Sequence, residues 1–228
     1  MVATTFAIVV AWLVILGLVL AFGWFVTHPA GSAIVRWDDE VAKDIAATRT
    51  SSLDPWADIG TMMGETIVTL VISPIVAIGL WIWKRSIVPA LFVALAVCGV
   101  GGFYFFGTEL IPRDRPPVKL LDSGLVPDAS FPSGHVGTAT TLVAVLIILV
   151  WTYARPARWW VLLLLLWPLF VVWARLYEGA HHVSDALTSV VYSVAWLAAL
   201  SVLLLRHRAG GTSPSPSRSR SQAATSAS

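Results

Sequence analysis

The composition of this 228-residue chain excludes an ordinary soluble domain. Charged residues make up 12% of it and hydrophobic residues 57%, whereas soluble domains carry roughly a quarter charged residues. The formal net charge of +2 is too small to indicate a nucleic-acid partner. These figures predict an integral membrane protein whose partner is the bilayer.

Six apolar segments are long enough to cross a bilayer core, which takes about 20 helical residues. The first segment has no basic residues ahead of it and is longer than the apolar stretch of a signal peptide, so we expect it to be retained as a helix. The sequence therefore predicts an all-α membrane domain over residues 1–209, built as a bundle of six transmembrane helices. In chain order the segments are 5–27, 62–83, 87–107, 134–153, 159–175 and 185–205.

The first long connection, residues 28–61, predicts a short amphipathic helix lying at the membrane interface. Its apolar and charged residues interleave in the way that a helix with one apolar face requires. The apolar members are Ile34, Val35, Trp37, Val41 and Ile45, and the charged ones are Asp38, Asp39, Lys43 and Asp44.

The connections divide by charge into two sets. One set contains Lys84 and Arg85, then Arg155 and Arg158, and then the arginines after residue 205, without any acidic residue. The positive-inside rule places this set in the cytoplasm, so both termini are predicted to be cytoplasmic. The last residues, 210–228, are rich in Ser, Pro and Arg and are predicted to form a disordered cytoplasmic tail.

Three polar clusters fall on the opposite, outer side by this topology, at residues 112–116, 131–135 and 175–185. Arginine offers planar, cationic donors that match phosphate oxygens, and a glycine at a helix start lets backbone N–H groups approach an anion. Two histidines in separate loops could supply a nucleophile and an acid for a leaving oxygen. The clusters therefore indicate phosphoryl chemistry at the outer face.

His181 and Asp185 are four residues apart, which would place them on one face if both belonged to a helix. A carboxylate beside an imidazole can fix its tautomer and stabilise the charge that develops on attack. Each feature also has an ordinary alternative: Arg115 could be a loop arginine, and Pro-Ser-Gly a turn with a helix cap. We interpret His182 as an interfacial residue without a catalytic role.

The chain resembles the type 2 phosphatidic acid phosphatases, or lipid phosphate phosphatases. The pattern of that family is Lys-x6-Arg-Pro, then Pro-Ser-Gly-His, then Ser-Arg-x5-His-x3-Asp. The second block is intact here, and the first and third are intact except at their first positions. The matching residues are Arg115-Pro116, Pro132-Ser133-Gly134-His135, and Arg175 with His181 and Asp185.

The resemblance implies a role for each matched residue. His181 would be the nucleophile, Asp185 would orient it, and His135 would protonate the leaving alcohol. Phosphate-binding groups would be Arg115, Arg175, Ser133 and Gly134, with Arg113 as a candidate substitute for the family lysine. That lysine falls at the uncharged Thr108, and the family serine at Ala174; Lys119 or a shifted alignment could also supply the missing charge.

The expected activity is metal-independent hydrolysis of a lipid phosphate monoester or diphosphate through a phosphohistidine, with no cofactor. The same site could instead transfer phosphate between lipids. Two alternatives from other classes are a non-catalytic phospholipid-binding membrane protein, which Thr108 favours, and a small transporter, which no matched pair of interrupted helices supports. The sequence gives neither the lipid nor the oligomeric state.

Overall fold

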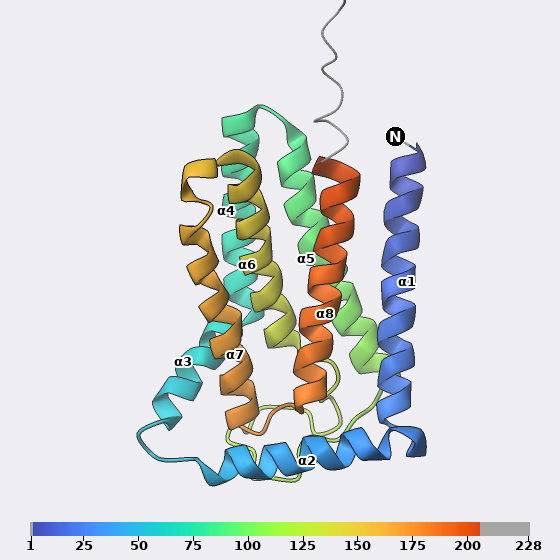
Figure 1. The fold of residues 1–228 in the computed structure, drawn as a ribbon, viewed down its shortest axis with the longest axis vertical. Helices are drawn as coiled ribbons and strands as arrows, with labels where there is room; N and C mark the ends of the chain where they lie inside the picture. Colours follow the sequence, from blue (N-terminus) through green and yellow to red (C-terminus); the bar gives the residue numbers. More distant parts are fainter. Residues whose placement is uncertain (1, 206–228) are drawn as a thin grey trace, which may run out of the picture.

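The computed structural model describes residues 2–205 and contains helices joined by loops, of which the longest is residues 111–133 (Figure 1). The predicted tail at 210–228 lies outside the described residues. The α-helices are α1 (Val2–Val26), α2 (Ser32–Ala47), α3 (Asp54–Gly64), α4 (Thr66–Lys84), α5 (Ile87–Leu110), α6 (Gly134–Tyr153), α7 (Leu166–Tyr177) and α8 (Val183–Leu200). Short 3-10 turns cover Pro29–Gly31, Arg155–Ala157 and Trp160–Leu165, and a π turn, Ser201–Leu205, extends α8.

Within the described residues, six helical segments are long and apolar enough to cross a membrane, which confirms the predicted bundle. One boundary was predicted wrongly. The second span does not begin at residue 62, because the extended backbone of Glu65 separates α3 from α4. The fifth span, Trp160–Tyr177, begins within one residue of the prediction, and its first turns are the 3-10 segment Trp160–Leu165, which continues as α7.

The connections group at the two ends of the bundle as their charges predict. The α4–α5 turn and the α6–α7 turn lie at the end that holds the N-terminus, whereas α2, the 111–133 loop and the α7–α8 turn lie at the opposite end (Figure 1). We call the latter the α2 end. Which end faces the cytoplasm remains a prediction.

The predicted amphipathic helix is present as α2, which runs across the α2 end of the bundle (Figure 1). Asp38 and Ala42 are buried and face the bundle, whereas Trp37 is 48% exposed. One face of α2 therefore covers the loops that carry the polar clusters. Its position at a membrane interface remains a prediction.

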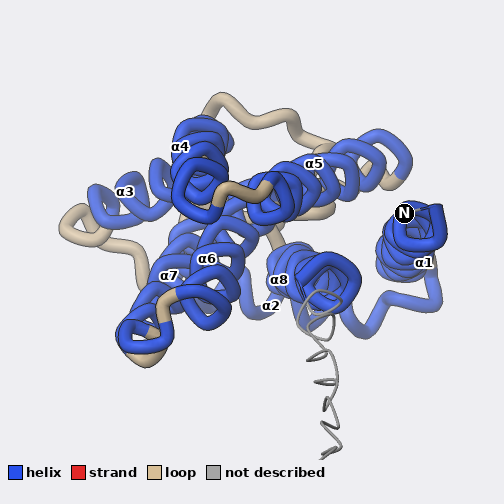
Figure 2. The backbone as a smooth tube through the Cα atoms, turned by 90° about the horizontal axis from the view of Figure 1, so that it is seen from above, coloured by secondary structure: helices blue, strands red, loops and turns tan. Residues whose placement is uncertain are grey.

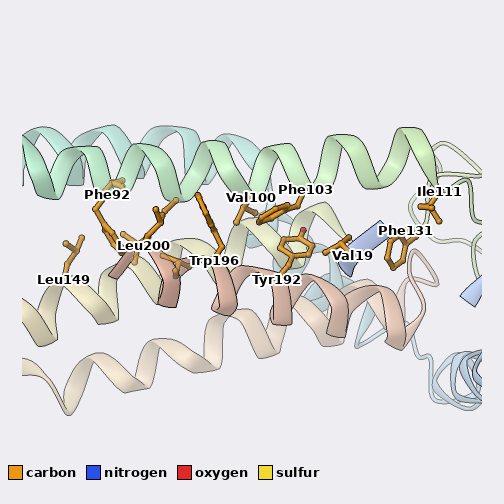
Figure 3. Packing of buried hydrophobic residues seen from close by; sticks show 14 residues of the cluster. Val19, Phe92, Val100, Phe103, Ile111, Phe131, Leu149, Tyr192, Trp196 and Leu200 are labelled. Carbon is orange, nitrogen blue, oxygen red and sulfur yellow. The ribbon is translucent and has the colours of Figure 1, made fainter. Parts of the chain in front are cut away.

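Helix α6 packs against α4, α5, α7 and α8, whereas α1 lies at the margin against α5 and α8 (Figure 2). Between α5 and α8, aromatic side chains including Phe103, Tyr192 and Trp196 form the buried core (Figure 3). Gly99 makes room for Trp196, because a Cβ at that position would lie 2.2 Å from the indole Nε1. The indole N–H donates to Leu95 O at 3.0 Å, so its polar group is satisfied inside the bundle. This packing fixes α8, and with it the polar residues at the start of α8.

Candidate active site

His181 lies in the tight turn between α7 and α8, not on a helix. Gly179 has a φ of +73°, a conformation that favours glycine and that reverses the chain after α7. His181 is 4% exposed, and its Nδ1 lies 2.7 Å from Ser130 O. Because a carbonyl oxygen can only accept, Nδ1 must carry the ring proton, which leaves a lone pair on Nε2 for attack.

The surroundings of His181 favour its neutral form. Burial lowers the pKa of His181 well below its ordinary value of 6.5, and the positive charge of Arg175 lowers it further, against an opposing effect from Asp185. A neutral imidazole is the nucleophilic form. The site therefore holds His181 ready to attack at neutral pH.

Asp185 does not make the contact with His181 that a shared helical face would give. Helix α8 begins at Val183, so His181 precedes it and Asp185 sits in its first turn. Asp185 Oδ2 accepts from Ser130 Oγ at 2.6 Å and from His182 N at 2.8 Å, while Oδ1 accepts from Arg113. Across residues 2–205, no hydrogen bond or ion pair joins this carboxylate to His181.

The start of α6 presents unpaired polar groups. Ser133 is the N-cap residue and is fully buried, yet its hydroxyl makes no capping bond and has no partner among the described residues. His135 follows in the first turn, and its Nε2 is likewise buried without a hydrogen-bond partner in the described chain. A carboxylate oxygen, Glu65 Oε1, lies 3.8 Å from this nitrogen, within ion-pair range but beyond a hydrogen bond.

Arg175, on the last turn of α7, is fully buried and offers one open edge. Its NH1 donates to Glu178 at 2.6 Å, to Thr61 at 3.1 Å and to Asp122 at 3.2 Å. Its Nε and NH2 have no partner among the residues described. These two nitrogens form the edge of a guanidinium that binds two oxygens of an anion at once. Its charge, with that of Arg115, acts on both His135 and His181.

Arg115 braces the loop beside these groups. Its Nε donates to Val126 O at 2.8 Å, its NH2 to Ala129 O at 3.2 Å, and its NH1 to Ala180 O. A guanidinium has five N–H donors, so these three bonds leave two for an anion. The structure thus brings together residues from six segments: α3, the 111–133 loop, α6, α7, the α7–α8 turn and α8.

A model of the PAP2 superfamily matches residues 86–209 of the chain, which include all three polar clusters. The chain belongs to the PAP2 superfamily. It is 29% identical over 139 residues to YbjG of Escherichia coli (strain K12), a protein that carries a provisional name as an undecaprenyl-diphosphatase. That match covers 58% of this chain and 66% of YbjG, slightly under two thirds of the relative's length.

Two solved structures share the fold. One is the transmembrane phosphatidylglycerolphosphate phosphatase of Bacillus subtilis, with a TM-score of 0.69 and 20% identity, covering 88% of this chain and 97% of that one. The other is LpxE of Aquifex aeolicus, with a TM-score of 0.56 and 20% identity, covering 71% and 93%. At this identity the likeness concerns the fold alone.

One position of the family pattern differs here in charge. Thr108, where the family lysine would fall, is half-buried, and its hydroxyl has no partner among the described residues. Arg113, the candidate substitute, is 6% exposed and forms ion pairs with Asp38 at 2.8 Å and with Asp185. Its NH1 also donates to Ser184 at 2.7 Å. Two buried carboxylates thus neutralise the charge of Arg113, which favours a structural role over a role in phosphate binding.

Sequence reasoning missed several residues of this site. His182 is 4% exposed and lies 3.3 Å from Asp185 and 3.4 Å from Asp39, so its interpretation as an interfacial residue is wrong. A capping arrangement, in which the third helical residue bonds back to the N-cap N–H, was the available signal. No such signal pointed to Ser130, or to the three partners of Arg175, which are Thr61, Asp122 and Glu178.

Burial raises the pKa of Glu178, and the positive charge of Arg175 acts in the opposite direction.

The sequence predicts no metal site. In the described range 2–205, no group of three or more His, Cys, Asp or Glu side chains is arranged to hold a metal ion. Metal independence itself remains a prediction.

Proposed function

We propose that the protein removes a phosphate group from a membrane lipid through a phosphohistidine formed on His181. The observation that carries this proposal is the set of buried polar atoms without partners among the described residues. Nε and NH2 of Arg175, Oγ of Ser133 and Nε2 of His135 all belong to it. Buried polar groups are nearly always hydrogen-bonded in proteins, and these groups fit an anion that bears several oxygens.

In the first step, Nε2 of neutral His181 attacks phosphorus. The Nε2–P bond forms as the bond from phosphorus to the lipid oxygen breaks. His135 gives its proton to the departing oxygen, and the negative charge of the bound phosphate, which offsets that of Arg175 and Arg115, favours this proton on His135 beforehand. Arg175, Arg115 and Ser133 hold the remaining phosphate oxygens, where fixed donors stabilise the charge of the transition state.

In the second step, water attacks the phosphohistidine. His135, now neutral, takes a proton from the water as the new P–O bond forms and the Nε2–P bond breaks. Inorganic phosphate leaves, and both histidines return to their starting states. No metal or cofactor is needed for this balance of atoms and protons.

A lipid substrate suits a site placed at one end of a membrane bundle. An apolar groove of about 510 Å³ between α1 and α8 extends to Ser184, which directly precedes Asp185. Such a groove could accommodate hydrocarbon while the headgroup meets the polar end. Monophosphates such as phosphatidic acid or phosphatidylglycerophosphate, and isoprenoid diphosphates, are the candidates. On the predicted topology, the substrate enters from the outer leaflet.

Phosphate release by the purified protein tests this proposal. The wild type and His181→Ala should be compared on phosphatidic acid, phosphatidylglycerophosphate and an isoprenoid diphosphate in mixed micelles. We expect release by the wild type on at least one lipid and none by the mutant, which should keep its fold. Equal release by the two proteins would refute the assignment of the nucleophile.

The same assay separates the alternatives. A lipid phosphotransferase would consume the donor and place its phosphate on an added lipid alcohol rather than in water. A non-catalytic lipid-binding protein, which Thr108 favours, would bind phosphate or the lipid without any turnover across the panel.

A further inference from the structure

Ser130 connects the two residues that the family pattern pairs directly. It is fully buried in the 111–133 loop. Its carbonyl oxygen accepts from Nδ1 of His181 at 2.7 Å, and its hydroxyl donates to Oδ2 of Asp185 at 2.6 Å. Its own N–H donates to Arg113 O at 3.0 Å, so all three of its polar groups are engaged.

We propose that Ser130 is the positioning residue through which Asp185 orients the nucleophile. This inference rests on the proposed function of His181. The backbone carbonyl of Ser130 fixes the tautomer of the His181 ring. The hydroxyl of Ser130 holds this carbonyl in place by its hydrogen bond to the carboxylate of Asp185, which belongs to α8. The sequence pattern alone would assign both tasks to a direct contact with Asp185.

The electrostatics of the reaction fit this arrangement. When Nε2 of His181 bonds to phosphorus, the ring becomes positively charged. The bond from Nδ1 to Ser130 O is then charge-assisted and strengthens, with the negative charge of Asp185 one hydrogen bond further along. The hydrogen bonds that connect His181 to Asp185 through Ser130 should therefore stabilise the transition state more than they stabilise bound substrate or product.

Ser130→Ala removes the hydroxyl but leaves the carbonyl in the chain. We expect kcat to fall at least about tenfold, since a hydrogen bond to a charged group is lost. Affinity for inorganic phosphate, which does not bond to Nε2, should be unchanged, whereas affinity for vanadate as a transition-state mimic should fall with kcat. If the alanine variant does not fold, Ser130→Cys keeps the volume with a much weaker donor and gives the same test.

Ser189→Ala is the matched control. Ser189 is also fully buried, and its hydroxyl donates to the main-chain oxygen of Asp185 at 3.1 Å rather than to its carboxylate. We expect wild-type kcat from this variant. A loss equal to that of Ser130→Ala would show that any buried serine near Asp185 has the same effect, and would overturn the specific role of Ser130.

A double-mutant cycle tests the connection itself. If Asp185 acts through Ser130, then Asp185→Asn should cost much less in the Ser130→Ala background than in the wild type. Losses that multiply would mean that the two residues act independently, and would overturn the proposal.

A measurement without turnover separates this inference from the proposed function. The ¹⁵N resonances of His181 should show the Nδ1–H tautomer in the wild type, and a share of the Nε2–H tautomer in Ser130→Ala. A wild-type ring protonated at Nε2 would refute the inference even if phosphate is released. Absence of phosphate release with the expected tautomer would refute the function and leave the link intact.

Discussion

Replacement of Arg113 by alanine tests whether this arginine stabilises the fold through its ion pairs or binds phosphate. Arg113 is 6% exposed and faces two fully buried carboxylates, Asp38 and Asp185. Removal of the guanidinium leaves both charges buried and uncompensated, and breaking a buried ion pair typically costs about 3–5 kcal/mol. For a chain of this length, each kcal/mol of lost stability lowers the unfolding temperature by about 2–4 °C. The variant should therefore unfold at a temperature lower by roughly 6–20 °C.

The assay combines thermal unfolding in detergent with inhibition of turnover by inorganic phosphate, measured at a temperature where the variant is folded. We expect a large drop in unfolding temperature and a lower kcat, with the affinity for phosphate unchanged. Arg36→Ala, which removes an exposed arginine from α2, is the matched control and should change neither. The reasoning is wrong if Arg113→Ala unfolds like the wild type but binds phosphate at least tenfold more weakly.

The remaining predictions concern metal, pH and topology. Activity should persist in EDTA and be blocked by vanadate; loss in EDTA with rescue by a divalent ion would indicate another mechanism. Since burial and Arg175 lower the pKa of His181, the acidic limb that His181 sets in the kcat/KM profile, which reports the free enzyme, should lie well below pH 6.5; an acidic limb at or above 6.5 would contradict the neutral, buried nucleophile. In a variant without the native cysteine, an impermeant reagent should label a cysteine at Ser123, but not one at Arg155, in intact cells; the reverse would invert the topology. Deletion of residues 210–228 should leave activity nearly unchanged.

The bundle could be predicted from the sequence because six apolar runs of sufficient length leave few other folds for a membrane chain. Helix α3 was missed because it is short, and because its end, Gly64, directly precedes the apolar run of α4. The pair Asp54-Pro55 was a usable start signal, since proline favours the first turn of a helix. Gly64 also lies close to α6 and α7, since a Cβ there would be 2.7 Å from Val171 Cγ1 and 2.9 Å from His135 Cβ, and such a close approach between distant segments is not visible in a local pattern.

For the site, the sequence motif predicted the residues that carry the chemistry, but not their hydrogen-bond partners. Spacing indicated which residues carry the chemistry, but the assumption that His181 and Asp185 share a helix gave the wrong partner for each. Helix α8 starts at Val183 and does not include His181, so Asp185 accepts from His182 N, and His181 donates to a loop carbonyl. Every residue has a backbone carbonyl, so the hydrogen bond from His181 to Ser130 O could not be predicted from residue types and was found only in the structure.

The most direct test of the central claim is to trap the intermediate. Wild-type protein turning over a lipid with ³²P in its terminal phosphate should be quenched in alkali, where the phosphorus–nitrogen bond survives, and its labelled peptide identified. The account predicts acid-labile label on His181 that disappears in His181→Ala. Continued phosphate release with no label on His181, or with the label on another residue, would contradict it.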